Sequence, residues 1–228
     1  MRNPFHAAAL ALLLAACGAP PARSPATLPQ PAAAAAPSGT TYRIDAAHSE
    51  LRLLVYRSGV MAALGHDHVI INRALEGWVN PVGSPAGAAF FLSLPASGFV
   101  VDEAAARAQE GADFSEEVGE DARAGTLRNM LSPAVLDAQS HSSITVQSVS
   151  IEPAAGAGQA TVRISVAGHE SSLSVPFTVD TSADRLHVQA AFTLRQTDLG
   201  LTPFAALLGA LRVEDQMRIK LDLVAVRD

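Results

Sequence analysis

The segments SSLSVPFTVD at residues 171–180 and RLHVQAAFTLR at residues 185–195 carry the clearest fold signal of this 228-residue chain. Apolar residues occupy every second position from Leu173 to Val179 and again from Leu186 to Leu194. Successive side chains of a β-strand point to opposite faces, so this alternation predicts strands with one apolar and one polar face. The short polar link from Ser182 to Asp184 is typical of a hairpin.

The same alternation continues on both sides of this hairpin. It runs from Val162 to Val166 and from Met217 to Leu223. Six further strand-like segments precede them, at residues 42–45, 50–57, 68–72, 74–80, 88–94 and 144–151. An open sheet leaves two exposed edges, and closing the sheet removes them. The sequence therefore predicts an all-β, antiparallel, closed or nearly closed barrel.

One segment, about residues 102–131, departs from this pattern and predicts a helical insertion. Asp102 is a suitable N-cap for the alanine-rich segment that follows it. A second helix is expected near residues 116–130, ending before Pro133.

Composition excludes several classes of protein. Hydrophobic residues make up 49% of the chain, which is too many for an intrinsically disordered protein. A single cysteine cannot form a disulfide within the chain. The 22 acidic residues exceed the 16 basic ones, and this balance argues against nucleic acid as a partner.

The N-terminus reads as a targeting segment. The apolar run at residues 7–16 is shorter than the roughly 20 residues needed to span a bilayer, but it has the length of a secretory signal core. It ends in the sequence LAACG at residues 14–18, which resembles a bacterial lipobox with Cys17 as the acylated residue. The alternative is an ordinary signal peptide cleaved at an Ala-x-Ala site, with Cys17 unmodified.

These features predict three parts: a lipoprotein signal peptide at 1–16, a lipidated Cys17 with an Ala/Pro-rich tether at 17–39, and a β-barrel domain at 40–228. The tether has no apolar periodicity, so it is expected to stay extended. We expect a periplasmic protein anchored to a membrane. Gly18 provides no acidic retention signal, which favours the outer membrane.

Six motifs, in order along residues 42–226, resemble the YceI-like polyisoprenoid-binding family. The first is YRIDAAHS at residues 42–49. The second combines LRNML at 127–131 with VLDA at 135–138. The others are ITVQS at 144–148, Gly168 with VPF at 175–177, RQTDLGL at 195–201 and VEDQMRI at 213–219. The resemblance implies a lipocalin-like, eight-stranded barrel with a helical insertion, which carries a long isoprenoid or fatty chain in its interior.

On this reading the protein is a lipid-anchored periplasmic binding protein for an amphipathic apolar chain. The burial of each methylene group would contribute about 0.8 kcal/mol to binding. The residues expected to line the cavity are Leu53, Val55, Phe91, Val146, Phe177 and Phe192. A shift of one residue in any strand would reverse the face that it presents.

A second hypothesis concerns the histidines of the segment GHDH at residues 65–68. His66 and His68 are two residues apart, so on a strand their rings share a face and could bind one divalent metal, with His48 or Asp45 as a third ligand. Two other interpretations stay open. The histidines could be hydrogen-bonded at a polar hairpin end, or they could orient the polar head of a ligand.

Enzymatic interpretations have little support. The sequence has no G-x-S-x-G, H-E-x-x-H or glycine-rich phosphate motif. Asp45, His48 and Ser49 are close in sequence, but neighbouring strand residues face opposite ways, which suits a catalytic relay poorly. The sequence therefore favours a binding protein. A solid barrel that acts as an interaction module without a ligand is the remaining alternative.

Overall fold

The alternating run at the C-terminal end of the chain forms β12 (Leu211–Arg227), the strand that pairs with four others. The computed structural model describes residues 41–81, 83 and 87–227. The predicted signal peptide, Cys17 and the tether lie outside the described residues. The other strands are β1 (Tyr42–Ile44), β2 (Glu50–Ser58), β3 (His68–Asn72), β4 (Glu76–Asn80), β5 (Ala89–Pro95), β6 (Phe99–Val101), β7 (Ser143–Ala154), β8 (Ala157–Val166), β9 (His169–Thr181), β10 (Arg185–Arg195) and β11 (Ala205–Ala206). The helices are α1 (Ala104–Ala108) and α2 (Glu120–Leu131).

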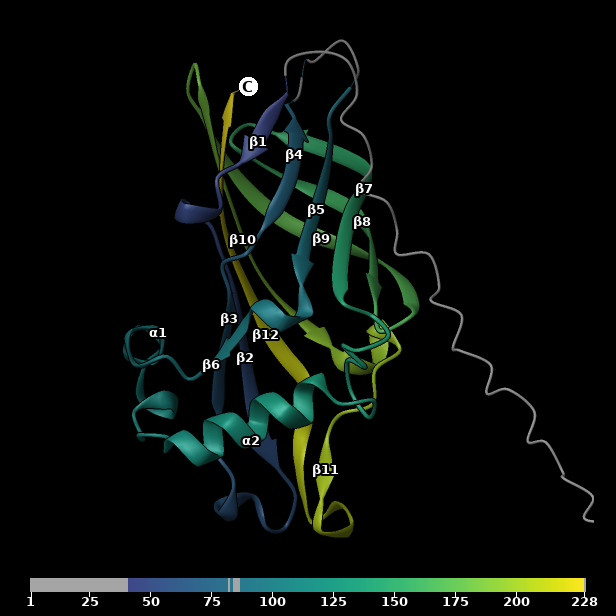
Figure 1. Cartoon of the computed structure of the whole chain (residues 1–228). Coiled ribbons are helices and arrows are strands. Elements are labelled where there is room, and N and C mark those ends of the chain that lie inside the picture. The colour runs from purple at the N-terminus through teal and green to yellow at the C-terminus, as the bar shows by residue number, and fades with distance from the viewer. Residues whose placement is uncertain (1–40, 82, 84–86, 228) are drawn as a thin grey trace, which may run out of the picture.

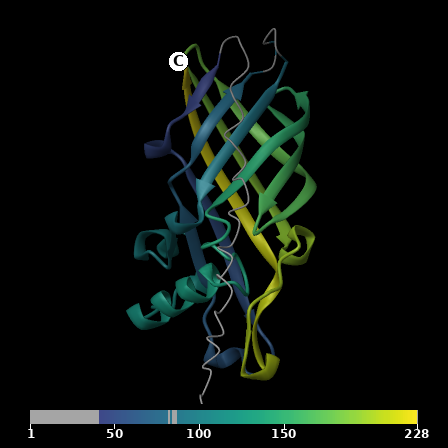
Figure 2. The same ribbon diagram turned by 45° about the vertical axis from the view of Figure 1, so that its right-hand side comes forward.

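Eight strands close into an antiparallel barrel. Each pairs with the next in the order β1–β4–β5–β7–β8–β9–β10–β12, and β1 pairs with β12 to complete the ring. Figures 1 and 2 show the strands winding around an elongated barrel, with β1 and the C-terminal end of β12 at the same end. The predicted all-β, eight-stranded, lipocalin-like barrel is confirmed.

Toward the other end, β12 changes its partner. Its last residues pair with β1, whereas residues 212–222 pair with β2, and the short 3-10 helix Ala46–His48 lies between these two partners in the chain. The sheet then continues from β2 to β3 and β6. Helix α2 packs against β6 and so covers the side of the barrel where the strand ladder stops. Within the described residues, no helix has the length and apolar character required to cross a bilayer.

The insertion between β6 and β7 covers the outer face of β2 and β3. Leu54, Val69 and Ile71 point outward from these strands and are buried against Ala106 and Phe114. The apolar runs of β2 and β3 therefore do not alternate, because both faces of these strands are buried.

The predicted helical insertion is confirmed, but two details differ. Helix α2 begins at Glu120 rather than near residue 116. Asp102 was expected to cap the first helix, yet Glu103 holds the N-cap position. Asp102 instead has φ +53 and is fully buried, and its carboxylate accepts a hydrogen bond from His68. The carboxylate of Asp102 is buried and pairs with a histidine that is distant in the sequence. These two features outweigh the preference of aspartate for an N-cap, and the local sequence does not reveal them.

Candidate functional site

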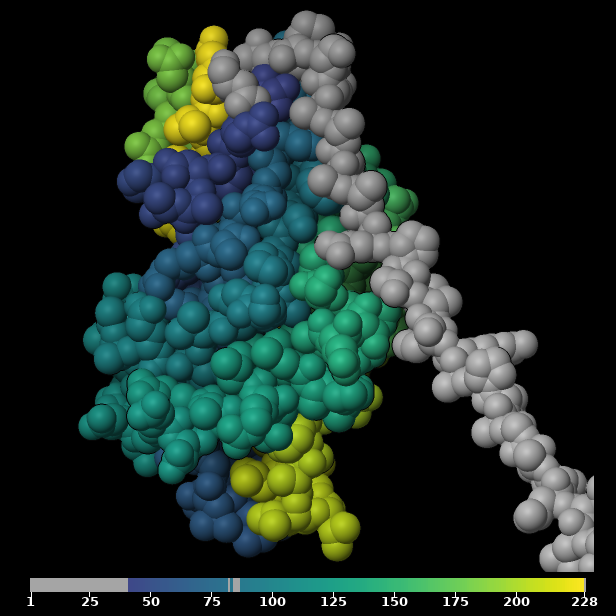
Figure 3. All heavy atoms as spheres, viewed as in Figure 1, coloured from purple at the N-terminus to yellow at the C-terminus, as the bar shows by residue number. Residues whose placement is uncertain are grey.

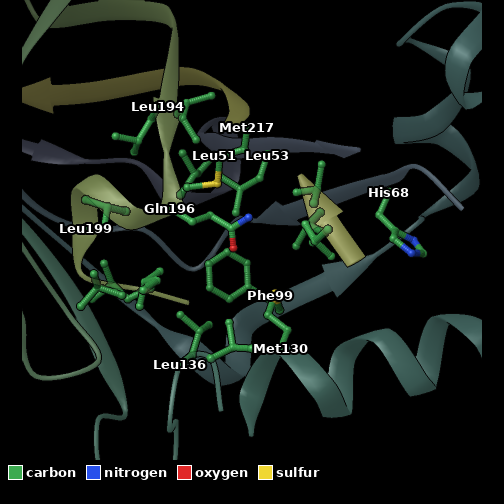
Figure 4. Close-up of a pocket in the computed structure, with 18 of the residues that line it drawn as sticks. Leu51, Leu53, His68, Phe99, Met130, Leu136, Leu194, Gln196, Leu199 and Met217 are labelled. Carbon is green, nitrogen blue, oxygen red and sulfur yellow. The ribbon is translucent and has the colours of Figure 1, made fainter. Parts of the chain in front are cut away.

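An apolar cavity of about 410 Å³ lies inside the barrel. Its volume falls in the range of about 300–1,000 Å³ that small-molecule sites occupy. Figure 4 shows leucine, methionine and phenylalanine side chains converging on it from several strands. The strand residues in its wall include Leu51, Leu53, Val55, Ile70, Phe90, Leu92, Leu94, Val146, Val162, Ile164, Val175, Ala190, Phe192, Leu194, Met217, Ile219 and Leu221.

The wall is continuous because its residues are neighbours across the strands as well as along them. Val146 on β7 lies opposite Leu92 on β5 and opposite Ile164 on β8. Likewise, Ala190 on β10 lies opposite Leu221 on β12. Directly opposed residues of antiparallel strands share a face, so these rows present one apolar surface inward.

The structure places four of the six expected lining residues in this wall: Leu53, Val55, Val146 and Phe192. Phe91 is buried, but Phe90 and Leu92 on either side of it hold the positions in the cavity wall. Phe177 packs against the main core cluster and contacts Gly158, whereas Val175 lines the cavity. For Phe91, period-two alternation explains the difference, since adjacent strand residues point to opposite faces.

One polar residue in the cavity wall, Gln196, was missed by the reasoning from sequence. Its side chain is buried among apolar neighbours, as Figure 4 shows, and its Nε2 donates a hydrogen bond of 2.7 Å to the carbonyl of Glu214. Gln196 is two residues after Leu194, which also faces the cavity. Extending the period-two alternation of β10 by one step would therefore have identified it.

The cavity wall near α2 contains several polar side chains beside apolar ones such as Met130. His66, His68 and Arg57 line it, together with Thr126 and Asn129 of the helix. The structure thus brings His66 and His68 to the same cavity, with their ring centroids 6.3 Å apart. No aspartate or glutamate of the described chain lines this cavity.

A buried network orients His68. Its Nδ1 lies 2.6 Å from Oδ2 of Asp102, and because an ionised carboxylate can only accept, Nδ1 donates this bond. Nε2 then faces Oγ1 of Thr126 at 3.4 Å. Arg107 donates to the other oxygen of Asp102 at 2.6 Å and also to the backbone carbonyls of Asp67 and Glu116.

These contacts set the charge of Asp102. Burial alone raises the pKa of a carboxyl, but the hydrogen bonds from His68, the backbone N–H of Val69 and Arg107 outweigh it and lower the pKa of Asp102 below its usual value. The carboxylate is therefore ionised at neutral pH and balances the buried guanidinium of Arg107.

His48 does not join His66 and His68. Val55 pairs with His68, so His48 lies about seven residues along the chain from that point, or roughly 20 Å of extended strand. Its Nδ1 is 2.7 Å from Asp45. Among the described residues, no group of three His, Cys, Asp or Glu side chains has the geometry to hold a metal ion.

Comparisons with known proteins give a family and a fold. A model of the YceI-like domain matches residues 42–225. No curated protein matches. The crystal structure of Burkholderia cenocepacia BcnA is similar, with a TM-score of 0.58 and 15% identity, over 80% of this chain and 99% of that chain. A polyisoprenoid binding domain from Saccharophagus degradans has a TM-score of 0.54 and 16% identity, over 82% and 98%.

Proposed function

This chain belongs to the YceI-like family, and from that premise we propose that it is a binding protein that holds the apolar chain of an amphipathic lipid, of isoprenoid or fatty-acid type. The observation that carries the proposal is the cavity of about 410 Å³ with its wall of aliphatic and aromatic side chains. Such a wall offers few hydrogen bonds, so affinity comes from burying methylene groups.

The polarity of the cavity supports an amphipathic ligand over a purely apolar one. The interior is aliphatic, whereas the end near α2 presents Arg57, His66, His68 and Thr126. A lipid would place its chain among the strands and its head at this polar end. The Saccharophagus degradans structure of similar fold is described as a polyisoprenoid binding domain, which is consistent with a chain of this kind.

The purified protein is expected to contain one apolar molecule per chain. Organic extraction of the full chain, followed by mass spectrometry, measures this, and native mass spectrometry gives the stoichiometry. Extraction of the denatured, washed protein is the control for lipid adsorbed to the surface. A protein that retains no apolar molecule and binds none when offered isoprenoid alcohols or fatty acids would contradict the proposal.

We further propose that the protein is anchored in the periplasm through lipid on Cys17. The lone cysteine lies in the lipobox-like segment, after an apolar run of signal-peptide length. Several acyl chains on one residue give stable membrane attachment where a single chain is marginal.

Cells grown with radiolabelled palmitate are expected to incorporate label into the protein. The Cys17→Ala variant should lose all of the label, because no other thiol exists in the chain. In cell fractionation, the variant should be recovered in the soluble periplasmic fraction rather than in the membrane fraction. Equal labelling of both proteins would contradict anchoring at this residue.

A further inference from the structure

Two loops at the α2 end of the barrel expose large apolar side chains. One joins β2 to β3 and exposes Val60, Met61 and Leu64, and the other joins β11 to β12 and exposes Leu207 and Leu208. These are five of the eight large hydrophobic residues exposed in the described chain. We name residues 59–65 and 207–210 of these loops the apolar tip; Asp67, at the base of the first loop, lies outside it and accepts a hydrogen bond from the backbone of Arg57. Figure 3 shows both loops projecting beyond α2, one in dark blue and one in yellow-green.

The two loops form one unit. The backbone N–H of Met61 donates a hydrogen bond of 2.9 Å to the carbonyl of Ala210. Gly59 has φ +94, and a Cβ at this position would lie 2.4 Å from the same carbonyl oxygen. Only glycine permits this close approach. The apolar side chains of both loops are therefore held together on one projection.

The apolar tip combines a strained backbone with exposed apolar side chains. Leu207 and Leu208 have φ values of +51 and +56, in the left-handed region that non-glycine residues seldom adopt. Leu208 is fully exposed, and Val60 retains 94% of its accessible surface. Strained backbone persists where the surrounding structure imposes it, and it gathers at functional positions. At the tip, this strained backbone holds the side chains of Leu207 and Leu208 exposed to solvent.

The chemistry of the tip suits a lipid bilayer. Residues 58–65 and 199–211 contain no aspartate, glutamate, lysine or arginine, in a chain with 17% charged residues. A narrow, convex, uncharged projection can enter the interfacial region of a bilayer without burying a charge. A protein partner would instead be expected to require a broader surface with polar contacts around its rim.

The tip adjoins the cavity. Gly65 at the base of one loop and Leu211 at the base of the other both line the cavity wall, together with Phe204. We propose that the apolar tip inserts into the surface of a lipid bilayer and places this end of the cavity against the membrane, so that a lipid passes between bilayer and barrel without crossing water.

The anchor proposed above would permit this orientation. The 24 residue steps from Cys17 to Thr41 can span at most about 80 Å when extended. The 17 residues of β12 extend over about 56 Å, from the end near β1 to the tip. A domain tethered at its β1 end can therefore turn its opposite end to the same membrane.

A fluorescent label at the tip tests this proposal. An NBD fluorophore is attached to Ala63→Cys, an exposed tip position that leaves the five apolar side chains intact, in the full chain carrying Cys17→Ser. With vesicles of phosphatidylethanolamine and phosphatidylglycerol, its emission should rise severalfold and be quenched by lipids with spin-labelled acyl chains. The matched control is Ala183→Cys, exposed in the β9–β10 hairpin at the other end, which should not respond.

Adding Val60→Ser and Leu208→Ser should weaken vesicle binding of the labelled tip at least about tenfold, since each removes an apolar side chain from the bilayer. Both side chains are exposed, so the fold should persist. Equal responses of the two labels, or none, would overturn the proposal. A response to protein concentration without vesicles would also overturn it, in favour of a second copy. None of these readouts requires bound cargo, so they are separate from the test of ligand binding.

Discussion

Replacing Ala190 by tryptophan is expected to abolish binding of an apolar chain. Ala190 is buried on β10 and lines the cavity. An indole ring at this position would fill space now open to a ligand. If it displaces about five methylene groups at about 0.8 kcal/mol each, the loss is roughly 4 kcal/mol, or about a thousandfold in Kd. Titration with a fluorescent fatty acid or isoprenoid analogue measures this change.

The neighbouring residue supplies a matched control. Ala191 is exposed on the other face of β10, opposite Lys220. The Ala191→Trp variant adds the same ring outside the barrel and should keep the wild-type Kd. Urea unfolding of both variants should separate lost binding from lost stability, because overpacking costs typically about 1–3 kcal/mol. Unchanged ligand affinity in a folded Ala190→Trp protein would mean that the cargo does not occupy this cavity.

The barrel could be predicted from sequence because its clearest strands have one apolar face and one solvent-exposed face, which gives a period-two alternation. Along β10 the apolar positions from Leu186 to Leu194 alternate with polar or small ones, and the structure points them inward. The break in alternation at residues 102–131 also predicts the helical insertion. The resemblance to the family added the number of strands, which periodicity alone does not provide.

The choice of cavity residues was less predictable where alternation fails. Phe90 and Phe91 are adjacent and both apolar, so the sequence does not indicate which of them faces inward. The pairing of Phe91 with Trp78 and Gln147 settles the register of β5, and that pairing joins residues far apart in the chain. On β2 the run Leu53-Leu54-Val55 is ambiguous for another reason, since the insertion buries its outer face.

Substituting Asp102 is expected to cause the largest loss of stability. Asp102 and Arg107 are both buried and lie 2.6 Å apart. The Asp102→Ala variant would leave the guanidinium without its counter-charge and His68 without its acceptor. Breaking one side of a buried ion pair typically costs about 3–5 kcal/mol, and the positive φ of Asp102 adds strain for alanine. Urea unfolding measures the change.

The residue that follows provides the control. Glu103 pairs with Arg73 at 2.8 Å on the surface, where an ion pair contributes about 0–1 kcal/mol. Glu103→Ala should therefore change the free energy of unfolding far less than Asp102→Ala. Because Arg107 also binds the carbonyls of Asp67 and Glu116, loss of Asp102 should loosen the insertion and the polar end of the cavity. Equal effects of the two substitutions would contradict this account.

The charge of Asp102 should also make stability depend on pH. Its pKa is lowered in the folded protein, so its contribution is present above the unfolded value of about 3.9 and is lost as pH falls through the lower folded value. Asp45, Glu103 and Glu110 have lowered pKa values too, so the wild-type profile alone is not diagnostic. Asp102→Asn tolerates the positive φ and removes the charge, while its amide nitrogen replaces one of the two accepting oxygens. The difference in unfolding free energy between wild type and this variant should be constant near neutral pH and shrink below about pH 4. A difference that persists undiminished into stronger acid would show that ionised Asp102 does not stabilise the fold.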